Sequence, residues 1–479
     1  MKYASLVLLA FLFTACGPRS TTIIYPGPEG EKKSDNFEMS VNNKPVFVYE
    51  ARVSKYPINQ IWPGYQRPLD QTEISSFAYF DFEGKVEIEI TSKENIKTLD
   101  IRPKEYGIVP VITGNSIKFK LSKPYQFIVE VNGYHHALHI FANPIETNTI
   151  NKQDPKVHYF GPGLHEAGVI KLNSDETVYI DGGAVVHGVI ESVNSRNVKI
   201  LGRGILDASK FQRGGGPNLI SLKNVVNGYV SGIILRDPHE WTVVPSGCDS
   251  ITFNNIKLIG LWRYNSDGID VVNCKNILIQ NTFIRAFDDN IAIKGLRHVY
   301  EEQHKIIENI KINNCVLWND WGRPIELGLE TVADTMKNIS FTNCFVPHFT
   351  WIAIDIQNGD RGYVKDVNFE NISIEDPILD SISIGYVPMD KKELGKTIEL
   401  IIKGFNWWTT DTIRGNINNI HLTNIRYNST NPTFINLVGC DALHMVNNIF
   451  IKDYFINNKK VTDPASIRKN EFVKNVSLQ

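Results

Sequence analysis

The sequence predicts an all-β protein in which a small antiparallel β-sandwich precedes a long parallel β-helix. Strand-like alternation of apolar and polar residues runs through most of the chain, and a short phrase recurs from about residue 197 onward. Each copy has a polar residue, mostly Asn, before an alternating apolar run, and most successive copies are about 23 to 33 residues apart. A repeat of that length without helical periodicity is typical of a parallel β-helix, in which each coil stacks its apolar residues on the next. The copies begin at Asn197, Ser250, Asn276, Asn309, Asn338, Asp366, Asn419 and Asn448.

The first residues resemble a bacterial lipoprotein signal. Lys2 supplies a positive charge, residues 6–13 are apolar, and the run ends at Ala15-Cys16-Gly17. We therefore expect residues 1–16 to be a signal peptide and Cys16 to become the lipidated first residue; a plain secretory signal is the alternative. The expected location is the cell envelope of a Gram-negative bacterium, anchored to the outer membrane. A periplasmic position is favoured over the cell surface because no acidic cluster follows Cys16.

The remaining chain divides into three predicted segments. Residues 17–36 are rich in Pro, Gly, Ser, Thr and Lys and are predicted to form a tether. Residues 37–146 alternate in short strands separated by turns, which predicts the β-sandwich, and residues 150–479 form the predicted β-helix. We expect the sandwich to cover the N-terminal end of the β-helix. The longest gap between repeats, residues 377–416, is interpreted as an inserted loop, in which Trp407-Trp408 either stacks on a sugar ring or packs the loop.

Composition and cysteine spacing narrow the functional classes. The formal net charge is −2 and no basic run occurs, which argues against a nucleic-acid partner. No pair of cysteines has CxxC spacing, so a zinc site is not predicted. An odd number of cysteines follows Cys16, which argues against a full disulfide framework, and the matching repeat positions of Cys315 and Cys344 favour stacked buried thiols over a disulfide. The cysteines after Cys16 are Cys248, Cys274, Cys315, Cys344 and Cys440.

Two acidic clusters, each followed by a strand-like run, are the candidate catalytic residues. Asp267 lies in Asn-Ser-Asp-Gly, and Asp288 and Asp289 begin Asp-Asp-Asn-Ile about one coil later. On neighbouring coils these carboxylates would crowd one patch, since parallel strands are roughly 4.8 Å apart. Adjacent carboxylates resist joint ionisation, so one stays protonated as an acid while others act as bases. Taken singly, Asp-Gly and Asp-Asp are ordinary turn residues; their matched positions favour a catalytic site for glycosidic hydrolysis.

These motifs resemble those of glycoside hydrolase family 28, the polygalacturonase-like enzymes. The similarity covers residues 160–475 and rests on Asn265-Ser266-Asp267-Gly268 together with Asp288-Asp289-Asn290-Ile291-Ala292-Ile293. It implies a right-handed, pectin-lyase-like β-helix and an inverting glycoside hydrolase with no metal or organic cofactor. Asp288 would be the general acid, and Asp267 and Asp289 would hold and deprotonate the water. The dextranase-like family 49 is the second choice, because it shares the β-helix, the three acids and an N-terminal sandwich.

Two departures from the family pattern bear on the substrate. Arg323 occupies the place of a family histidine, and Ile354-Asp355-Ile356-Gln357 replaces the Arg-Ile-Lys that holds a substrate carboxylate. A permanent cation at position 323 would lower the pKa of nearby carboxyls, or form a surface salt bridge. Glu326 and Asp355 are expected to line the cleft, which disfavours homogalacturonan and suits neutral sugars; Arg263, Arg285, Lys294 and Arg361 are alternative ligands for a carboxylate or sulfate. The expected substrate-binding residues are Asn265, Asp270, Lys294, Arg323, Glu326, Asp355 and Gln357.

The favoured function is hydrolysis of a polysaccharide or oligosaccharide, with exo action preferred, by a monomer attached to a membrane only through its lipid. A dextranase- or isopullulanase-like α-glucan hydrolase is the nearest alternative. Two further classes remain open: a polysaccharide lyase, and a non-catalytic glycan-binding β-helix. The lyase would need a free Arg or Lys base and often calcium on acidic ligands.

Overall fold

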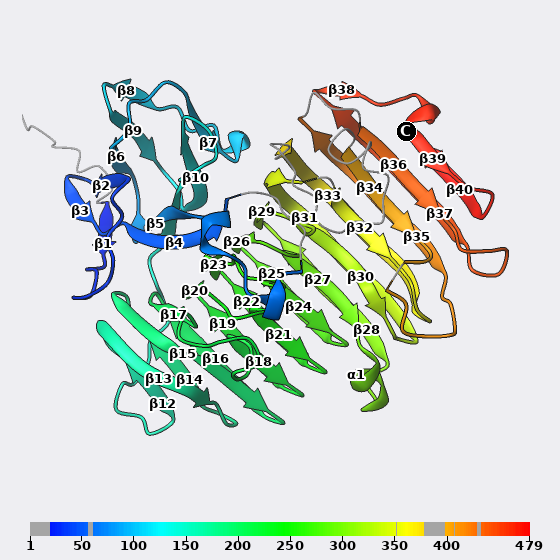
Figure 1. The fold of residues 1–479 in the computed structure, drawn as a ribbon, viewed down its shortest axis with the longest axis horizontal. Coiled ribbons are helices and arrows are strands. Elements are labelled where there is room, and N and C mark those ends of the chain that lie inside the picture. The colour runs from blue at the N-terminus through cyan, green and yellow to red at the C-terminus, as the bar shows by residue number, and fades with distance from the viewer. Residues whose placement is uncertain (1–19, 56–60, 351, 378–397, 407, 429–432) are drawn as a thin grey trace, which may run out of the picture.

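The computed structural model describes residues 20–55, 61–350, 352–377, 398–406, 408–428 and 433–479. Two β-sheets form an N-terminal sandwich, and 29 strands form a parallel β-helix (Figure 1). The described chain has one α-helix, α1 (Arg297–Glu301), and four 3-10 helices, η1 (Pro63–Tyr65), η2 (Leu69–Gln71), η3 (Lys104–Tyr106) and η4 (Pro464–Ser466). The predicted all-β fold with a β-helix is confirmed.

The sandwich encloses its own apolar core. All its strand pairs are antiparallel except β5 with β11, which are parallel. One sheet contains β1 (Thr21–Ile24), β4 (Tyr49–Ser54), β5 (Thr72–Glu83), β7 (Leu99–Arg102), β10 (Tyr125–Val131) and β11 (Leu138–Pro144). The other contains β2 (Phe37–Val41), β3 (Lys44–Val46), β6 (Val86–Ser92), β8 (Val111–Thr113) and β9 (Ser116–Leu121). Because β1 pairs with β5, the expected tether over residues 17–36 is wrong for this segment.

The coils of the β-helix stack their strands into three columns. The back sheet contains β12 (Val157–Phe160), β14 (Thr177–Ile180), β16 (Arg196–Gly202), β19 (Val226–Ser231), β22 (Asp249–Asn254), β25 (Lys275–Gln280), β28 (Ile306–Asn313), β31 (Thr335–Phe349), β33 (Tyr363–Pro377), β35 (Ile417–Tyr427), β37 (Val446–Ile456) and β40 (Val473–Leu478), with β38 (Lys459–Lys460) beside β37. The acid-bearing sheet contains β13 (Gly163–Lys171), β15 (Ala184–Val193), β18 (Ile220–Lys223), β21 (Val243–Ser246), β24 (Ile269–Val272), β27 (Ile291–Gly295), β30 (Ile325–Thr331), β32 (Ile352–Gln357), β34 (Ile398–Lys403), β36 (Thr433–Val438) and β39 (Ile467–Lys469). The sandwich-facing sheet contains β17 (Ile205–Asp207), β20 (Ile234–Arg236), β23 (Lys257–Ile259), β26 (Phe283–Ala286) and β29 (Val316–Asn319).

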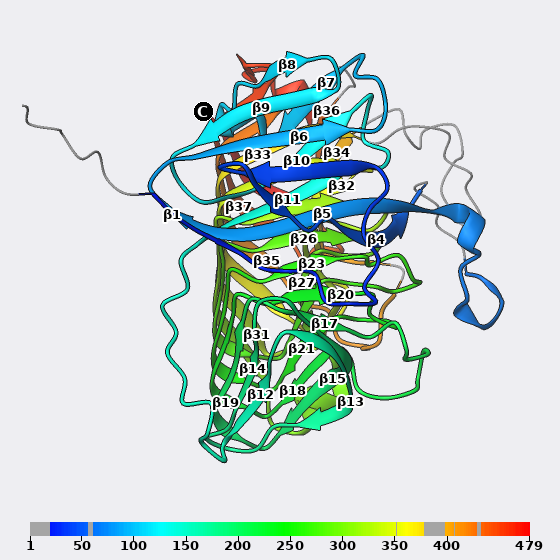
Figure 2. The same cartoon turned by 90° about the vertical axis from the view of Figure 1, so that its left-hand side faces the viewer.

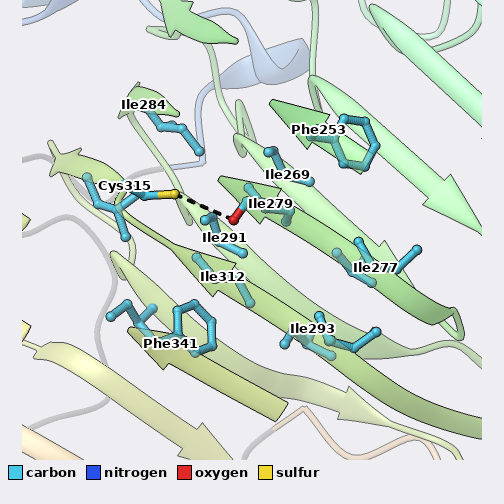
Figure 3. Close-up of a cluster of buried hydrophobic side chains, with 14 of the residues drawn as sticks. Phe253, Ile269, Ile277, Ile279, Ile284, Ile291, Ile293, Ile312, Cys315 and Phe341 are labelled. Atoms are coloured by element: carbon cyan, nitrogen blue, oxygen red, sulfur yellow. Dashed lines mark hydrogen bonds between the residues drawn. The ribbon is translucent and has the colours of Figure 1, made fainter. Parts of the chain in front are cut away.

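The apolar residue of each repeat points into the coil and stacks on its counterpart one coil away. Figure 3 shows this for Ile277, Ile279, Ile312 and Phe341, and the Cys315 thiol donates to the backbone oxygen of Ile279. Asn residues at the corners have left-handed backbone and form ladders: Asn309 donates through its amide to Asn276 at 2.9 Å. Asn tolerates this conformation better than most residues, which explains its place in the repeat.

The sandwich packs along the side of the β-helix rather than over its N-terminal end. Its residues Tyr49, Phe77 and Phe141 share one buried cluster with Ile205, Ile234, Ile259, Phe283 and Trp318 of the β-helix. Both views show the sandwich lying across the sandwich-facing sheet (Figures 1 and 2). The expectation of an end cap is therefore corrected. Apolar residues at outward positions of these strands need a cover, and the sandwich supplies it along several coils.

The structure also tests two smaller expectations, that residues 377–416 are an inserted loop and that the cysteines are free thiols. Residues 377–416 are not simply an inserted loop, because β34 pairs with both β32 and β36 as a regular rung of the acid-bearing sheet. Trp407 lies outside the described residues, and Trp408 is 51% exposed. Cys248, Cys274, Cys315, Cys344 and Cys440 are all free thiols, as expected, and all but Cys440 are buried.

Candidate active site

The turns that enter β24 and β27 bring the predicted catalytic acids together. The Gly268 N–H donates to the Asp289 carbonyl at 2.8 Å, which joins the turn carrying Asp267 to the next coil. A Cβ at Gly268 would lie 2.3 Å from the Asn290 carbonyl oxygen, so only glycine permits this approach. The spacing argument is confirmed: Asp267 and Asp289 occupy neighbouring coils.

Backbone contacts fix Asp288 and Asp289 from the following coil. The Asn319 side-chain amide donates to the Asp288 carbonyl at 2.7 Å, and the Arg323 N–H donates to Asp289 Oδ1 at 2.9 Å. A Cβ at Gly322 would lie 2.7 Å from Asp288 Oδ1, so this glycine leaves room for the carboxylate. The Asn265 amide donates to Asp288 Oδ2 at 3.4 Å, which places Asn265 beside the expected acid.

Lys294 and Asp270 hold Asp267 in place. The Lys294 ammonium lies 3.1 Å from Asp267 Oδ2 and 2.9 Å from Asp270 Oδ1, and all three side chains are buried. Lys294 also lies 4.2 Å from the centre of the Trp241 ring, a cation–π contact. Asp270 and Lys294 were expected to bind substrate, and the structure places both against Asp267.

The carboxyl groups of this cluster bind protons more tightly than usual. Burial and the neighbouring Asp289 charge raise the pKa of Asp288 to about 7, against the opposing effects of Lys294 and Arg323. Burial and the Lys294 ammonium act in opposite directions on Asp270, whose pKa rises to about 6. Burial and Asp270 together raise the pKa of Asp267 well above its ordinary value. Arg323 does lower the pKa of Asp288, as expected, but burial and the Asp289 charge outweigh this effect.

Arg323, Glu326, Asp355 and Gln357 form a second charged group one and two coils further on. The Arg323 Nε lies 3.1 Å from Asp355 Oδ2 and 3.7 Å from Glu326 Oε2, and Gln357 donates to Asp355 at 2.7 Å. Glu326 and Asp355 are partners in register, as their sequence positions predict. Both are 0% exposed, so the expectation that they line a cleft is corrected: they hold the Arg323 guanidinium.

The other arginines considered as anion ligands already have carboxylate partners. Arg285 is buried against Asp320 and Trp318, Arg263 pairs with Asp237, and Arg361 pairs with Asp411. These pairings direct their charges toward structural partners rather than toward the catalytic candidates. Lys294 and Arg323 are the cations that act on the pKa of Asp288.

Two further residues, Asn290 and Arg213, position the site through hydrogen bonds that the sequence does not predict. Asn290 is buried and donates to the carbonyls of Ile284 and Trp318, while its Oδ1 accepts from Asn319. Arg213 donates to Asn265 Oδ1 at 2.9 Å. Asn290 follows the Asp-Asp pair and was open to detection, whereas Arg213 lies 52 residues before Asn265 in a segment without a motif.

Metal binding, membrane spanning and lipidation are three further properties that bear on function. The residues that the structure describes contain no group of three or more His, Cys, Asp or Glu side chains arranged to hold a metal ion. No helix among them is long and apolar enough to span a membrane. Cys16, the expected lipidation site, lies outside the described residues.

Comparison with known proteins identifies the family. The model of "Glycosyl hydrolases family 28" matches residues 206–470, more than half of the chain, including all three acids. The chain belongs to this family. As a glycosyl hydrolase of family 28, it carries its Asp-Gly and Asp-Asp motifs on neighbouring coils of the acid-bearing sheet.

Curated relatives match only a portion of the chain. A "Probable polygalacturonase" from Arabidopsis thaliana is 26% identical over 173 residues, which cover 35% of this chain and 36% of the relative. A "Putative galacturan 1,4-alpha-galacturonidase A" from Aspergillus niger is 25% identical over 175 residues, which cover 30% of this chain and 38% of the relative. The match thus spans little more than a third of each relative's length.

Solved structures share the fold. Dex49A from Penicillium minioluteum matches with a TM-score of 0.63 at 14% identity, over 95% of this chain and 96% of that chain. An exopolygalacturonase from Thermotoga maritima matches with a TM-score of 0.52 at 15% identity, over 63% of this chain and 79% of that chain. At such low identities the likeness concerns the fold alone.

Proposed function

We propose that this family 28 protein is an inverting hydrolase that cleaves a poly- or oligosaccharide, with Asp288 as general acid. The observation that carries the proposal is the gathering of Asp267, Asp288 and Asp289 on neighbouring coils, where burial and the Asp289 charge raise the pKa of Asp288. A carboxyl with a pKa of about 7 is protonated in mildly acidic solution and donates its proton to the departing glycosidic oxygen.

Asp289 and Asp267 supply the water in this mechanism. Asp289 Oδ1 accepts a hydrogen bond from the Arg323 N–H, an arrangement suited to a carboxylate, and its second oxygen remains to deprotonate water. Asp267 is held by Lys294 and orients the same water. Attack on the face opposite the leaving group inverts the anomeric configuration, which requires an acid and base about 6.5–9.5 Å apart.

The charge of the site favours a neutral sugar at the cleavage point. Lys294 and Arg323 are both committed to carboxylates, and the next cation, Lys403, lies in register with Gln357 one coil beyond Asp355. Because both cations are neutralised by carboxylates, they attract a uronate weakly, and carboxyl groups that hold protons suit hydrogen bonds to hydroxyl groups. The acidic side chains around the cleavage point are Asp267, Asp270, Asp288 and Asp289, whereas Glu326 and Asp355 are buried against Arg323.

A screen of oligosaccharides tests both the hydrolysis and the neutral-sugar preference. Purified protein and an Asp288→Asn control are incubated with isomalto-oligosaccharides, oligogalacturonides and sulfated galactan oligosaccharides, and new reducing ends are measured. Release from a neutral glycan, absent in the control, is the expected result, and proton NMR at early times should show the inverted anomer. Release from galacturonides alone would overturn the neutral-sugar argument. Products that absorb in the ultraviolet would indicate a lyase, and binding without release would indicate a glycan-binding protein.

We also propose that Cys16 anchors the protein to the cell envelope, as its signal-like surroundings indicate. In cells supplied with radiolabelled palmitate, the wild-type protein should carry label and sediment with membranes. Cys16→Ser protein should do neither, and unlabelled wild-type protein would refute the anchor.

A further inference from the structure

A loop of the sandwich reaches the turns that carry the catalytic acids. Residues 61–71 follow β4, carry η1 and η2, and leave the sandwich at the right of Figure 2. Trp62 of this loop is buried with Phe287 and Trp321, which directly precede Asp288 and Gly322. The two domains therefore meet at the site as well as at the sandwich-facing sheet.

Arg67 fastens this loop to the same turns. Its Nη1 donates to the Trp262 carbonyl at 3.3 Å, and its guanidinium lies 4.6 Å from the centre of the Phe287 ring. Trp62 and Arg67 are 2% and 4% exposed, so these two side chains account for the attachment of the loop. Tyr65, which lies between them in the sequence, is 47% exposed and therefore leaves part of its ring open to solvent.

Tyr65 instead belongs to an exposed aromatic surface. Its ring stacks on that of Tyr264 with centroids 5.4 Å apart, and the Arg213 guanidinium lies 4.6 Å from its centre. Tyr65 also has a left-handed backbone (φ 57°), an unfavourable conformation for a bulky residue. Such strain is commonly retained where a side chain has a function.

Hydrogen bonds connect this surface to the expected general acid. Tyr264 directly precedes Asn265, and Arg213 donates both to the Tyr264 carbonyl and to Asn265 Oδ1. Asn265 in turn donates to Asp288 Oδ2. Tyr65 is therefore connected to Asp288 through Arg213 and Asn265.

We propose that Tyr65, together with Tyr264 and Arg213, forms a sugar-binding subsite built jointly by the sandwich and the β-helix. Tyrosine offers an apolar face to a sugar ring and a hydroxyl to its rim, and Arg213 holds Tyr65 and Tyr264 beside Asn265. The inference rests on the proposed function, because it assigns this subsite to the glycan that the acids cleave. It gives the sandwich a role in substrate recognition.

Binding measurements in the inactive background test the subsite separately from catalysis. Tyr65→Ala and Tyr65→Phe are made with Asp288→Asn, and calorimetry measures binding of isomaltotetraose and tetragalacturonate. Loss of the ring should weaken binding of at least one tetrasaccharide about 10-fold, the effect of roughly 1.4 kcal/mol, while Tyr65→Phe retains most of the affinity. The matched control is Phe450→Ala, an exposed ring (38%) that stacks on His421 of the back sheet, and it should change nothing.

The outcomes separate the two proposals. With active protein, Tyr65→Ala should raise KM for tetrasaccharides more than for disaccharides and leave kcat nearly unchanged, whereas a folding defect would lower kcat for both. Turnover by wild-type protein with equal affinity in Tyr65→Ala would overturn the subsite and leave the hydrolase standing. Tyr65-dependent binding without any turnover by wild-type protein would support the subsite and overturn the hydrolase. Failure of both tetrasaccharides to bind would also count against the subsite.

Discussion

Buried carboxylates serve opposite purposes at the domain interface and on the acid-bearing sheet. At the interface, Glu130 lies 2.8 Å from Arg102 and 2.5 Å from His348, and Arg102 also reaches Glu375 of β33. These cations outweigh burial and lower the pKa of Glu130 to about 2. On the acid-bearing sheet the acids outnumber their cations, and the pKa of Asp288 rises to about 7.

The two regions therefore couple to pH with opposite sign. Glu130 has a lowered pKa, so the stability it contributes is present above its ordinary pKa and is lost as pH falls toward 2. Asp288 has a raised pKa, so the folded protein binds its proton more tightly than the unfolded chain. Its effect on stability is most favourable at low pH and declines as pH rises toward 7. The interface carboxylate Glu130 therefore stabilises the fold at neutral pH, whereas Asp288 destabilises it once its proton is lost.

Asp288→Asn should show the largest effect. The amide cannot donate a proton as an acid does, so turnover should fall by about 10³-fold or more while the fold survives. Initial rates on the responsive glycan measure the loss, and thermal unfolding at pH 8 checks the fold. The variant should be at least as stable as wild type at that pH, because it lacks an ionised carboxylate beside Asp289; a marked drop in Tm would contradict this comparison.

Arg102→Met should damage the interface. It leaves Glu130 and Glu375 buried with a cation removed, which costs about 3–5 kcal/mol of unfolding free energy in comparable cases. Chemical denaturation measures the change. Lys93→Met removes an exposed pair with Glu38 and should cost about 1 kcal/mol or less, so equal losses in the two variants would contradict the distinction.

Gly322→Ala should affect the site more than the fold. The added Cβ would lie 2.5 Å from the Asp288 carbonyl carbon and would displace the acid. Misplacement of a catalytic group by such a shift lowers kcat by about 10²-fold. Steady-state kinetics beside Gly216→Ala, where a Cβ meets only Phe211 at 3.4 Å, provides the test; unchanged kcat would show that the acid tolerates the contact.

The pH dependence of activity should show the smallest effect. Activity should fall as pH rises through about 7, because Asp288 loses the proton it must donate. Arg323 lowers the pKa of Asp288, so Arg323→Gln should move this alkaline limb upward by up to about one pH unit. Profiles of kcat/KM measure the limb. A downward shift would mean that the guanidinium acts on Asp288 through its position rather than its charge.

Features of the fold and the site that follow the repeat period were predictable from sequence, whereas features set by tertiary contacts were not. Coil length predicts that Asp267 lies one coil from the Asp288-Asp289 pair, and the period of two puts Glu326 and Asp355 on the outward face; the structure pairs Asp267 with Asp289 and Glu326 with Asp355. The side on which the sandwich packs was not predictable, since Phe141 meets Phe283 only through tertiary contact. The partners of Arg323 and the attachment of Arg67 to Trp262 likewise depend on side-chain paths that spacing does not encode.

The lateral position of the sandwich has a consequence for how the molecule unfolds. Each coil of a solenoid contacts only its sequence neighbours, so coils can open one after another from either end. Here one buried cluster joins the sandwich to strands from Val185 to Trp318, and Arg102 extends the attachment to β33. These coils must separate together from their cover, whereas β36, β37 and β40 lie beyond it. Native-state hydrogen exchange should accordingly divide the β-helix into a cooperative unit under the sandwich and a last few coils that exchange earlier.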